Sequence, residues 1–173
     1  MKVLANTNQG RRREQNEDYY YVSDGFSSYD IYMLADGMGG YKGGEIASKL
    51  AIEAARRYID SHFEEIDHDK EKILELIKQA MDYANSVVFE KAKSAEELKG
   101  MGTTLEICLI YNNRAYIGHI GDSRIYRIRD KFMRKLTTDH SYVETLVKGG
   151  TITKEEAKHH PKKNMLMKAL RLQ

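Results

Sequence analysis

The residue with the clearest capacity for chemistry in this sequence is Asp36, which directly follows the apolar run 31–35. Glycine fills three of the next four positions, residues 37–40. A carboxylate at the end of a strand can hold a metal ion when the surrounding backbone is free to approach closely. A strand that ends in a simple Asp-Gly turn would show the same local pattern.

Three other polar segments favour the first of these alternatives. One contains Glu17 and Asp18, one contains Thr103 and Thr104, and one contains Asp122. The donors in these segments are hard oxygen atoms, and no cluster of Cys and His residues accompanies them. Oxygen donors of this kind favour Mg²⁺ or Mn²⁺ over Zn²⁺. The residue types therefore predict a site for hard divalent cations.

Together, and in this order, the four segments resemble those of the type 2C, or PPM-type, metal-dependent serine/threonine protein phosphatases of bacteria. The resemblance extends from about Asn6 to about Leu170. It implies hydrolysis of phosphoserine and phosphothreonine in proteins by a metal-activated water, with Mn²⁺ or Mg²⁺ as cofactor. Two such ions that share a carboxylate lower the pKa of a bridging water and neutralise the phosphate under attack.

The resemblance also assigns roles by position. Asp36 matches the carboxylate that bridges both metals, and Gly37 matches the residue whose backbone carbonyl binds the second metal. Glu17 and Asp18 match an acidic pair that holds metal-bound waters. Asp122 matches a ligand of a third, weaker metal. The resemblance thus implies metal binding by Asp18, Asp36, Gly37 and Asp122.

Arg13 lies four residues before Glu17 and matches the phosphate-binding arginine of the family. Its guanidinium fork can bind phosphate oxygens bidentately. Arg11 and Arg12 are not at the matching position, and a solvated basic surface is the alternative interpretation of all three. Catalytic roles are therefore expected for Arg13, Glu17, Asp18 and Asp36.

The resemblance ends with the stretch 161–170, whereas relatives continue into further strands and two late aspartates that bind the first metal. We expect a C-terminally incomplete domain that is weakly active or inactive alone. The alternative is a non-catalytic, phosphatase-like binding or regulatory module. Surfaces left open by the missing strands would allow a homo-oligomer. The resemblance implies phosphoprotein substrates and an opposing serine/threonine kinase.

Composition limits the other classes of function. The chain has 173 residues, 31% of them charged, with a net charge of +2. This balance is typical of a single globular domain, residues 1–173, and not of a nucleic-acid-binding surface. There is no apolar stretch of about 18 residues and no signal peptide, so we expect a cytoplasmic protein without a membrane span. Cys108 is the only cysteine, which excludes an internal disulfide.

The elements that must position these residues follow from periodicity. Residues 19–22 predict a strand, and residues 31–35 predict a second strand that is buried on both faces. Two amphipathic helices, one from residue 43 and one at 70–93, predict an antiparallel pair packed on a sheet. A continuous antiparallel meander is expected after Gly102, and its strands are 105–109, 115–120, 125–129 and 132–136.

Two short helices complete the pattern, at 142–148 and 154–159, and Thr153 and Glu156 form a capping box before the second. Strands, a helix pair and a further run of strands indicate an α+β domain. The family resemblance implies a four-layer sandwich of two antiparallel β-sheets flanked by antiparallel helix pairs.

Overall fold

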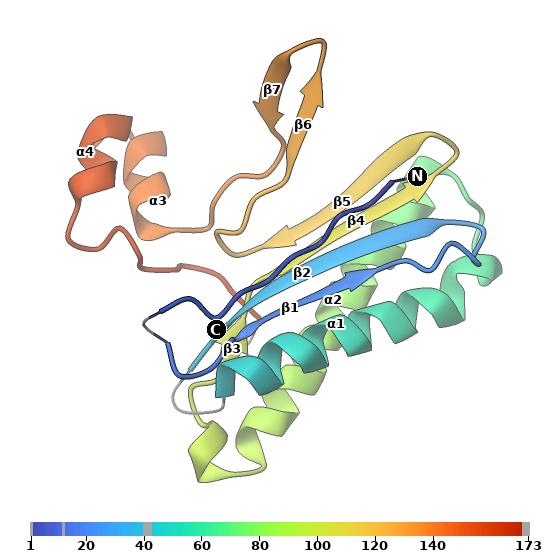
Figure 1. Ribbon diagram of the computed structural model, residues 1–173, viewed down its shortest axis with the longest axis horizontal. Coiled ribbons are helices and arrows are strands. Elements are labelled where there is room, and N and C mark those ends of the chain that lie inside the picture. The colour runs from blue at the N-terminus through green and yellow to red at the C-terminus, as the bar shows by residue number, and fades with distance from the viewer. Residues whose placement is uncertain (1, 12, 40–42, 171–173) are drawn as a thin grey trace.

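The computed structural model describes residues 2–11, 13–39 and 43–170. Arg12, considered above for its charge, lies outside these ranges. A larger antiparallel sheet forms the centre of the fold, with two long helices on one of its faces (Figure 1). Its strand order is β1-β2-β4-β5, and β3 extends the pairing at the end of β2. These strands are β1 (Asp18–Val22), β2 (Asp30–Met38), β3 (Gly102–Thr103), β4 (Leu105–Tyr111) and β5 (Arg114–Ile120).

The two long helices are α1 (Gly43–His62) and α2 (Lys70–Lys93), which confirms the predicted pair. Each is followed by a short 3₁₀ helix, η1 (Phe63–Glu65) after α1 and η2 (Glu96–Leu98) after α2. Alanines line the buried side of α1, so its backbone can lie close to the sheet. Asp69 caps the N-terminus of α2 by accepting a hydrogen bond from the Lys72 N–H at 2.8 Å.

The hydrophobic core lies between the sheet and these helices, and the opposite face of the sheet is open in the described part of the chain. On β2, Ile31, Met33 and Ala35 are buried in the core, whereas Leu34 on the other face is 45% exposed. The prediction that 31–35 is buried on both faces is therefore wrong. A strand alternates its side chains, and helices cover only one side.

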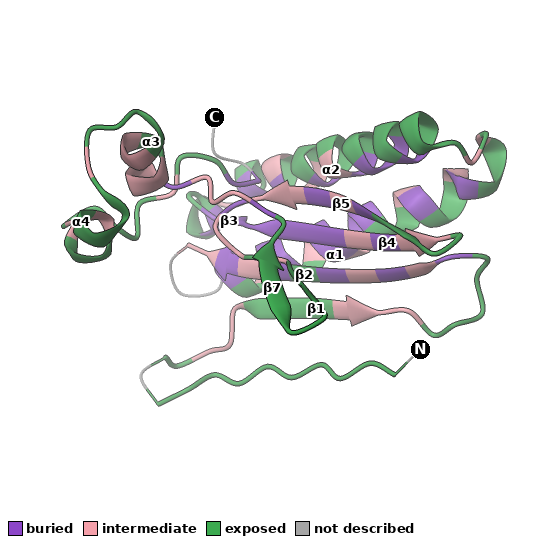
Figure 2. Cartoon of the chain, turned by 90° about the horizontal axis from the view of Figure 1, so that it is seen from above, coloured by how far each residue is buried: buried purple, intermediate pink, exposed green. Residues whose placement is uncertain are grey.

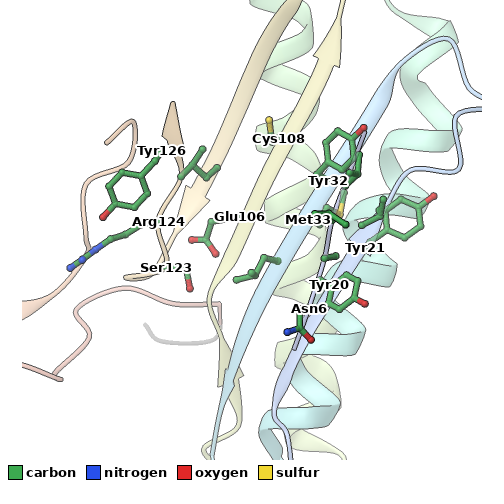
Figure 3. Close-up of a pocket in the computed structure, with 16 residues that line it drawn as sticks. Asn6, Tyr20, Tyr21, Tyr32, Met33, Glu106, Cys108, Ser123, Arg124 and Tyr126 are labelled. Atoms are coloured by element: carbon green, nitrogen blue, oxygen red, sulfur yellow. The ribbon is translucent and has the colours of Figure 1, made fainter. Parts of the chain in front are cut away.

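The open face holds an apolar pocket of about 690 Å³ between the sheet and the segment that leads into β6 (Figure 3). Tyr32 and Cys108 are among the residues that line it. Cys108 is only partly buried, and burial raises the pKa of its thiol. The thiol therefore stays protonated at neutral pH, as expected for a small apolar side chain.

The second sheet is a separate hairpin of β6 (Tyr126–Arg129) and β7 (Phe132–Lys135), which projects from the larger sheet and is exposed (Figures 1 and 2). The expected continuous meander is wrong at this point. The chain leaves the first sheet after β5 at Gly121, which has φ +120° and where a side chain would overlap Thr104. The Leu136 N–H donates to the Ile125 carbonyl at 2.8 Å and closes the hairpin.

The short helices α3 (Tyr142–Lys148) and α4 (Lys154–His159) have the predicted bounds. The capping box of Thr153 and Glu156 is confirmed. The chain then returns to the larger sheet, where Leu170 bridges to Thr103 and is buried. The predicted α+β class with two antiparallel sheets is confirmed, and no helix among the described residues is long and apolar enough to cross a membrane.

Candidate active site

A polar pocket of about 670 Å³ lies where the ends of β2 and β3 meet the loop after β5. It is slightly smaller than the apolar pocket, but it contains the charged groups that could bind metal and phosphate. All the site residues predicted from the sequence line it except Asp18. The lining residues are Arg13, Glu17, Asp36, Gly37, Met38, Gly39, Thr104, Asp122, Asn164 and Leu166.

Asp18 enters the site through its pairing with Asp36 across β1 and β2. The two acids are close enough for the charge of Asp18 to act on the carboxyl group of Asp36. Burial raises the pKa of Asp36 to about 6, and the negative charges of Asp18 and Asp122 add to this effect, while the Arg13 charge opposes it. The negative charge of these carboxylates therefore exceeds the positive charge of Arg13, and this excess favours binding of a cation.

The backbone N–H and carbonyl of Asp36 are both hydrogen-bonded by threonines, Thr103 at the end of β3 and Thr104 directly after it. Its N–H donates to Thr104 Oγ1 at 2.9 Å. Its carbonyl accepts from the Thr104 N–H and from Thr103 Oγ1, both at 3.0 Å. The two threonines therefore fix the main chain that carries the central carboxylate.

Gly37 is buried where three segments of backbone converge. Its N–H donates to the Glu17 carbonyl at 3.1 Å. A Cβ at Gly37 would overlap the Gly44 carbonyl and would lie 2.6 Å from the Glu17 carbonyl oxygen. Only glycine allows the start of α1 to approach the end of β2 this closely. The role of the Gly37 carbonyl as a metal ligand stays a prediction.

Among the described residues that line the pocket, Arg13 is the one with a positive charge. Its guanidinium Nη1 lies 3.4 Å from Glu17 Oε2, and the Arg13 side chain remains 58% exposed. Glu17 therefore holds one side of the guanidinium, while the other donors stay accessible to an anion. This geometry suits a phosphate-binding arginine, the role predicted for Arg13.

The loop that carries Asp122 is held by the segment before α3. The Gly121 N–H donates to His140 Nδ1 at 3.2 Å. The backbone N–H of His140 donates in turn to the Gly121 carbonyl at 2.7 Å. Arg124 Nη2 lies 2.6 Å from Asp139 Oδ2, and Arg124 Nε lies 3.0 Å from the same oxygen. Burial works against ionisation of Asp139, but hydrogen bonds from Arg124 and Lys135 lower its pKa.

Glu106 is a carboxylate inside β4 that the sequence did not lead us to expect next to the site; it is 4% exposed and its Oε2 lies 3.4 Å from Thr104 Oγ1. It lies between Leu105 and Ile107, so a charge in an otherwise apolar strand was the available signal. Asn164 and Leu166 were also missed as pocket residues. The path of the chain after α4 brings them to the site, and no local pattern predicts that path.

The donors present fit a hard divalent cation in kind, because they are carboxylate oxygens at a site where negative charge is excessive. Their arrangement is open. Within residues 2–11, 13–39 and 43–170, no three Asp, Glu, His or Cys side chains converge as a complete ligand set. The contact between Asp18 and Asp36 supplies two carboxylates, and Asp122 also lines the pocket.

Comparison with known proteins adds independent findings. A family model described as protein phosphatase 2C matches residues 7–171. A putative protein phosphatase 2C-type of Streptococcus pyogenes is 36% identical over 171 residues, which is 98% of this chain and 68% of that protein.

Two solved structures have the same fold. The serine/threonine phosphatase of S. agalactiae has a TM-score of 0.82 and 34% identity, over 94% of this chain and 66% of that one. The catalytic domain of the phosphatase PstP, solved with two manganese ions, has a TM-score of 0.75 and 38% identity, over 93% of this chain and 63% of that one. This chain therefore spans slightly less than two thirds of these solved chains.

Proposed function

The chain belongs to the protein phosphatase 2C family, and from this premise we propose that it carries the metal-binding and phosphate-binding part of a serine/threonine phosphatase active site. The observation that carries this proposal is the contact between Asp18 and Asp36 in a pocket that also contains Arg13. Excess negative charge attracts metal ions there, and the exposed guanidinium attracts the phosphate.

Asp18, Asp36, Asp122 and the carbonyl of Gly37 would hold the metal, which is Mn²⁺ or Mg²⁺. The oxygen donors and the two manganese ions bound by the PstP catalytic domain support this choice. When bound, such ions supply Lewis acidity and a nucleophilic water near neutral pH. A third ion at Asp122 belongs to the same proposal.

The protein's own groups would orient the phosphoester. Arg13 would bind two phosphate oxygens through its fork, and Glu17 would hold that fork in place. Met38 lines the pocket and has no proton to donate, so the leaving serine or threonine oxygen would take its proton from water. Thr104 would keep the Asp36 main chain fixed during the reaction.

The substrates proposed are proteins that carry phosphoserine or phosphothreonine, and the proposed opposing partner is a serine/threonine kinase. The names of the relatives as serine/threonine phosphatases support the substrate class. A cytoplasmic location stays a prediction, as does the single domain over residues 1–173. A homo-oligomer stays a prediction as well, supported by exposed apolar side chains on the hairpin such as Ile128 and Phe132.

A second candidate function is a binding module that holds a phosphoprotein without hydrolysis. The open arrangement of the carboxylates favours it, because no complete ligand set closes among the described residues. We accordingly propose that turnover by this chain alone is weak. Arg13 would still bind phosphate in such a module, so the two candidates differ in metal-dependent hydrolysis and not in phosphate recognition.

A Mn²⁺ titration with p-nitrophenyl phosphate as substrate tests the proposal. The phosphatase proposal expects weak release of p-nitrophenol that saturates with Mn²⁺ and disappears in Asp36→Asn. Asp30→Asn, on the same strand, is the control and should retain the activity. Binding of a phosphopeptide without any metal-dependent turnover would favour the module and contradict the phosphatase proposal for this chain.

A further inference from the structure

Glu106 is a buried carboxylate that the proposed chemistry does not use. It projects from β4 on the side away from α1 and α2 and lies beside the Ser123 side chain (Figure 3). Its Oε1 lies 2.9 Å from His119 Nδ1, and its Oε2 lies 3.4 Å from Thr104 Oγ1. Burial raises the pKa of Glu106, while the His119, Ser123 and Thr104 side chains act to lower it. These contacts of the carboxyl group are all with polar side chains, as a buried charge requires.

The contacts of His119 determine its hydrogen positions. Its Nε2 lies 2.8 Å from the Thr138 carbonyl, which only accepts, so Nε2 carries a hydrogen. His119 Nδ1 and the Glu106 carboxyl group then share one further proton. Burial works to lower the pKa of His119, but the hydrogen bonds to Glu106 and Thr138 raise it above its ordinary value. Glu106 and His119 thus form one closely coupled, partly buried unit.

Thr104 connects this unit to Asp36. Its Oγ1 accepts the Asp36 N–H at 2.9 Å, so its own hydrogen must point elsewhere. The acceptors within reach are Ser123 Oγ at 3.1 Å and Glu106 Oε2 at 3.4 Å. A carboxylate accepts only, so Glu106 orients both hydroxyl groups and leaves the Thr104 lone pair directed at Asp36.

Ser123 and His119 connect the same unit to Asp122. Ser123 is the next residue after Asp122. The His119 ring stacks on the His140 ring with centroids 4.7 Å apart, and His140 bonds the backbone of Gly121 in both directions. Hydrogen bonds and one ring contact therefore connect both Asp36 and the loop of Asp122 to the Glu106–His119 pair.

We propose that Glu106 and His119 are positioning residues that fix Asp36 and Asp122 relative to each other for metal binding. The proposal rests on the proposed function, because it assumes that both acids serve one metal site. Groups that orient metal ligands without touching the metal typically change metal affinity by about 10–100-fold when they are removed. The unit should therefore control metal affinity more strongly than it controls stability.

Glu106→Gln and His119→Asn test the proposal through Mn²⁺ binding by isothermal titration calorimetry, beside thermal unfolding. Each variant should weaken Mn²⁺ binding about tenfold. The double variant should weaken Mn²⁺ binding to about the same extent as either single variant, because the pair acts as a unit. Tyr29→Phe is the matched control, since it removes a partly buried hydrogen bond to Asp60 at the far end of β2 and should leave Mn²⁺ binding unchanged.

Mn²⁺ binding by Glu106→Gln and His119→Asn at the affinity of the unchanged chain would overturn the positioning role. If Asp36→Asn also binds Mn²⁺ normally, the proposed function fails as well, so the two failures can be distinguished.

A measurement on the unchanged chain covers the case in which the variants do not fold. On Mg²⁺ addition, the NMR signals of the His119 ring should shift with the same concentration dependence as the Asp36 amide, and a silent His119 would overturn the proposal.

Discussion

Asp18 and Asp36 lie directly opposite each other at the end of the β1–β2 ladder, where the antiparallel register pairs their Cα atoms. Opposed like charges destabilise a sheet, because paired side chains share one face. The pair nevertheless sits beside the pocket that holds Arg13, and the pKa of Asp36 is raised to about 6 by burial and by the neighbouring acids. The register of two strands thus prepares a cation site at a cost in stability.

Asp36→Asn should therefore stabilise the metal-free chain at neutral pH. The folded-state pKa of Asp36 lies above its ordinary value of 3.8, so its contribution to stability is full below about pH 4 and is lost as pH rises through about 6. The asparagine of the variant does not ionise, so the free energy of unfolding of Asp36→Asn should exceed that of the unchanged chain by about 1–3 kcal/mol at pH 7.5. Urea unfolding at pH 4 and pH 7.5 measures this, and the two chains should converge at pH 4.

Asp30→Asn is the control for that experiment, since Asp30 begins the same strand away from the pocket. It should unfold like the unchanged chain at both pH values. An Asp36→Asn chain that is less stable than the unchanged chain at pH 7.5 would show that the carboxylates do not oppose folding.

Arg13→Ala should weaken phosphate binding without weakening Mn²⁺ binding. The exposed fork of Arg13 offers charge-assisted hydrogen bonds to phosphate, whose loss costs about 1.5–3 kcal/mol, or about tenfold or more in affinity. Calorimetry with inorganic phosphate in the presence of Mg²⁺ measures the change. Arg11→Ala is the neighbouring control, and equal losses in both variants would mean that only general basic charge attracts phosphate.

Gly37→Ala should destabilise the chain by about 2 kcal/mol or more, because the added Cβ meets backbone of Gly44 and Glu17 that cannot rotate away. Thermal unfolding checks this. Gly149→Ala is the control, since a Cβ there would meet its nearest neighbour, the Thr145 carbonyl oxygen, at an ordinary 3.4 Å. Equal unfolding temperatures for the two variants would contradict the close packing assigned to Gly37.

Leu170→Ala should cost about 2–4 kcal/mol, because Leu170 is 2% exposed in the core and its backbone pairs with Thr103. Leu4→Ala provides the comparison at a fully exposed leucine and should leave stability unchanged. Chemical denaturation of both variants measures the difference. A negligible effect of Leu170→Ala would mean that the final described residues do not belong to the folded core.

Local patterns predicted the helices well. The bounds of α2, α3 and α4 follow from periodicity and from caps such as the Thr153 and Glu156 box, whose partners are neighbours in the sequence. The helix bounds could be predicted because the information that specifies them is short-range. The expectation that Arg13, Asp36 and Asp122 belong to one site came instead from the family resemblance, and these residues line the same pocket.

Features that depend on distant contacts were not predictable in the same way. The chain leaves the first sheet at Gly121, where a side chain would overlap Thr104 from another segment. The burial of Glu106 depends on His119 and Ser123, which the fold brings to it from β5 and the following loop. The open sheet face likewise reflects which elements cover it, and alternation within one strand cannot reveal that.

The most direct test of the account is anomalous diffraction from a crystal of this chain soaked in Mn²⁺. We predict a manganese peak between the carboxylates of Asp18 and Asp36, within coordination distance of an oxygen from each. A well-ordered pocket without manganese at that point, at Mn²⁺ concentrations that saturate the binding curve, would contradict the claim that the β1–β2 register builds the metal site.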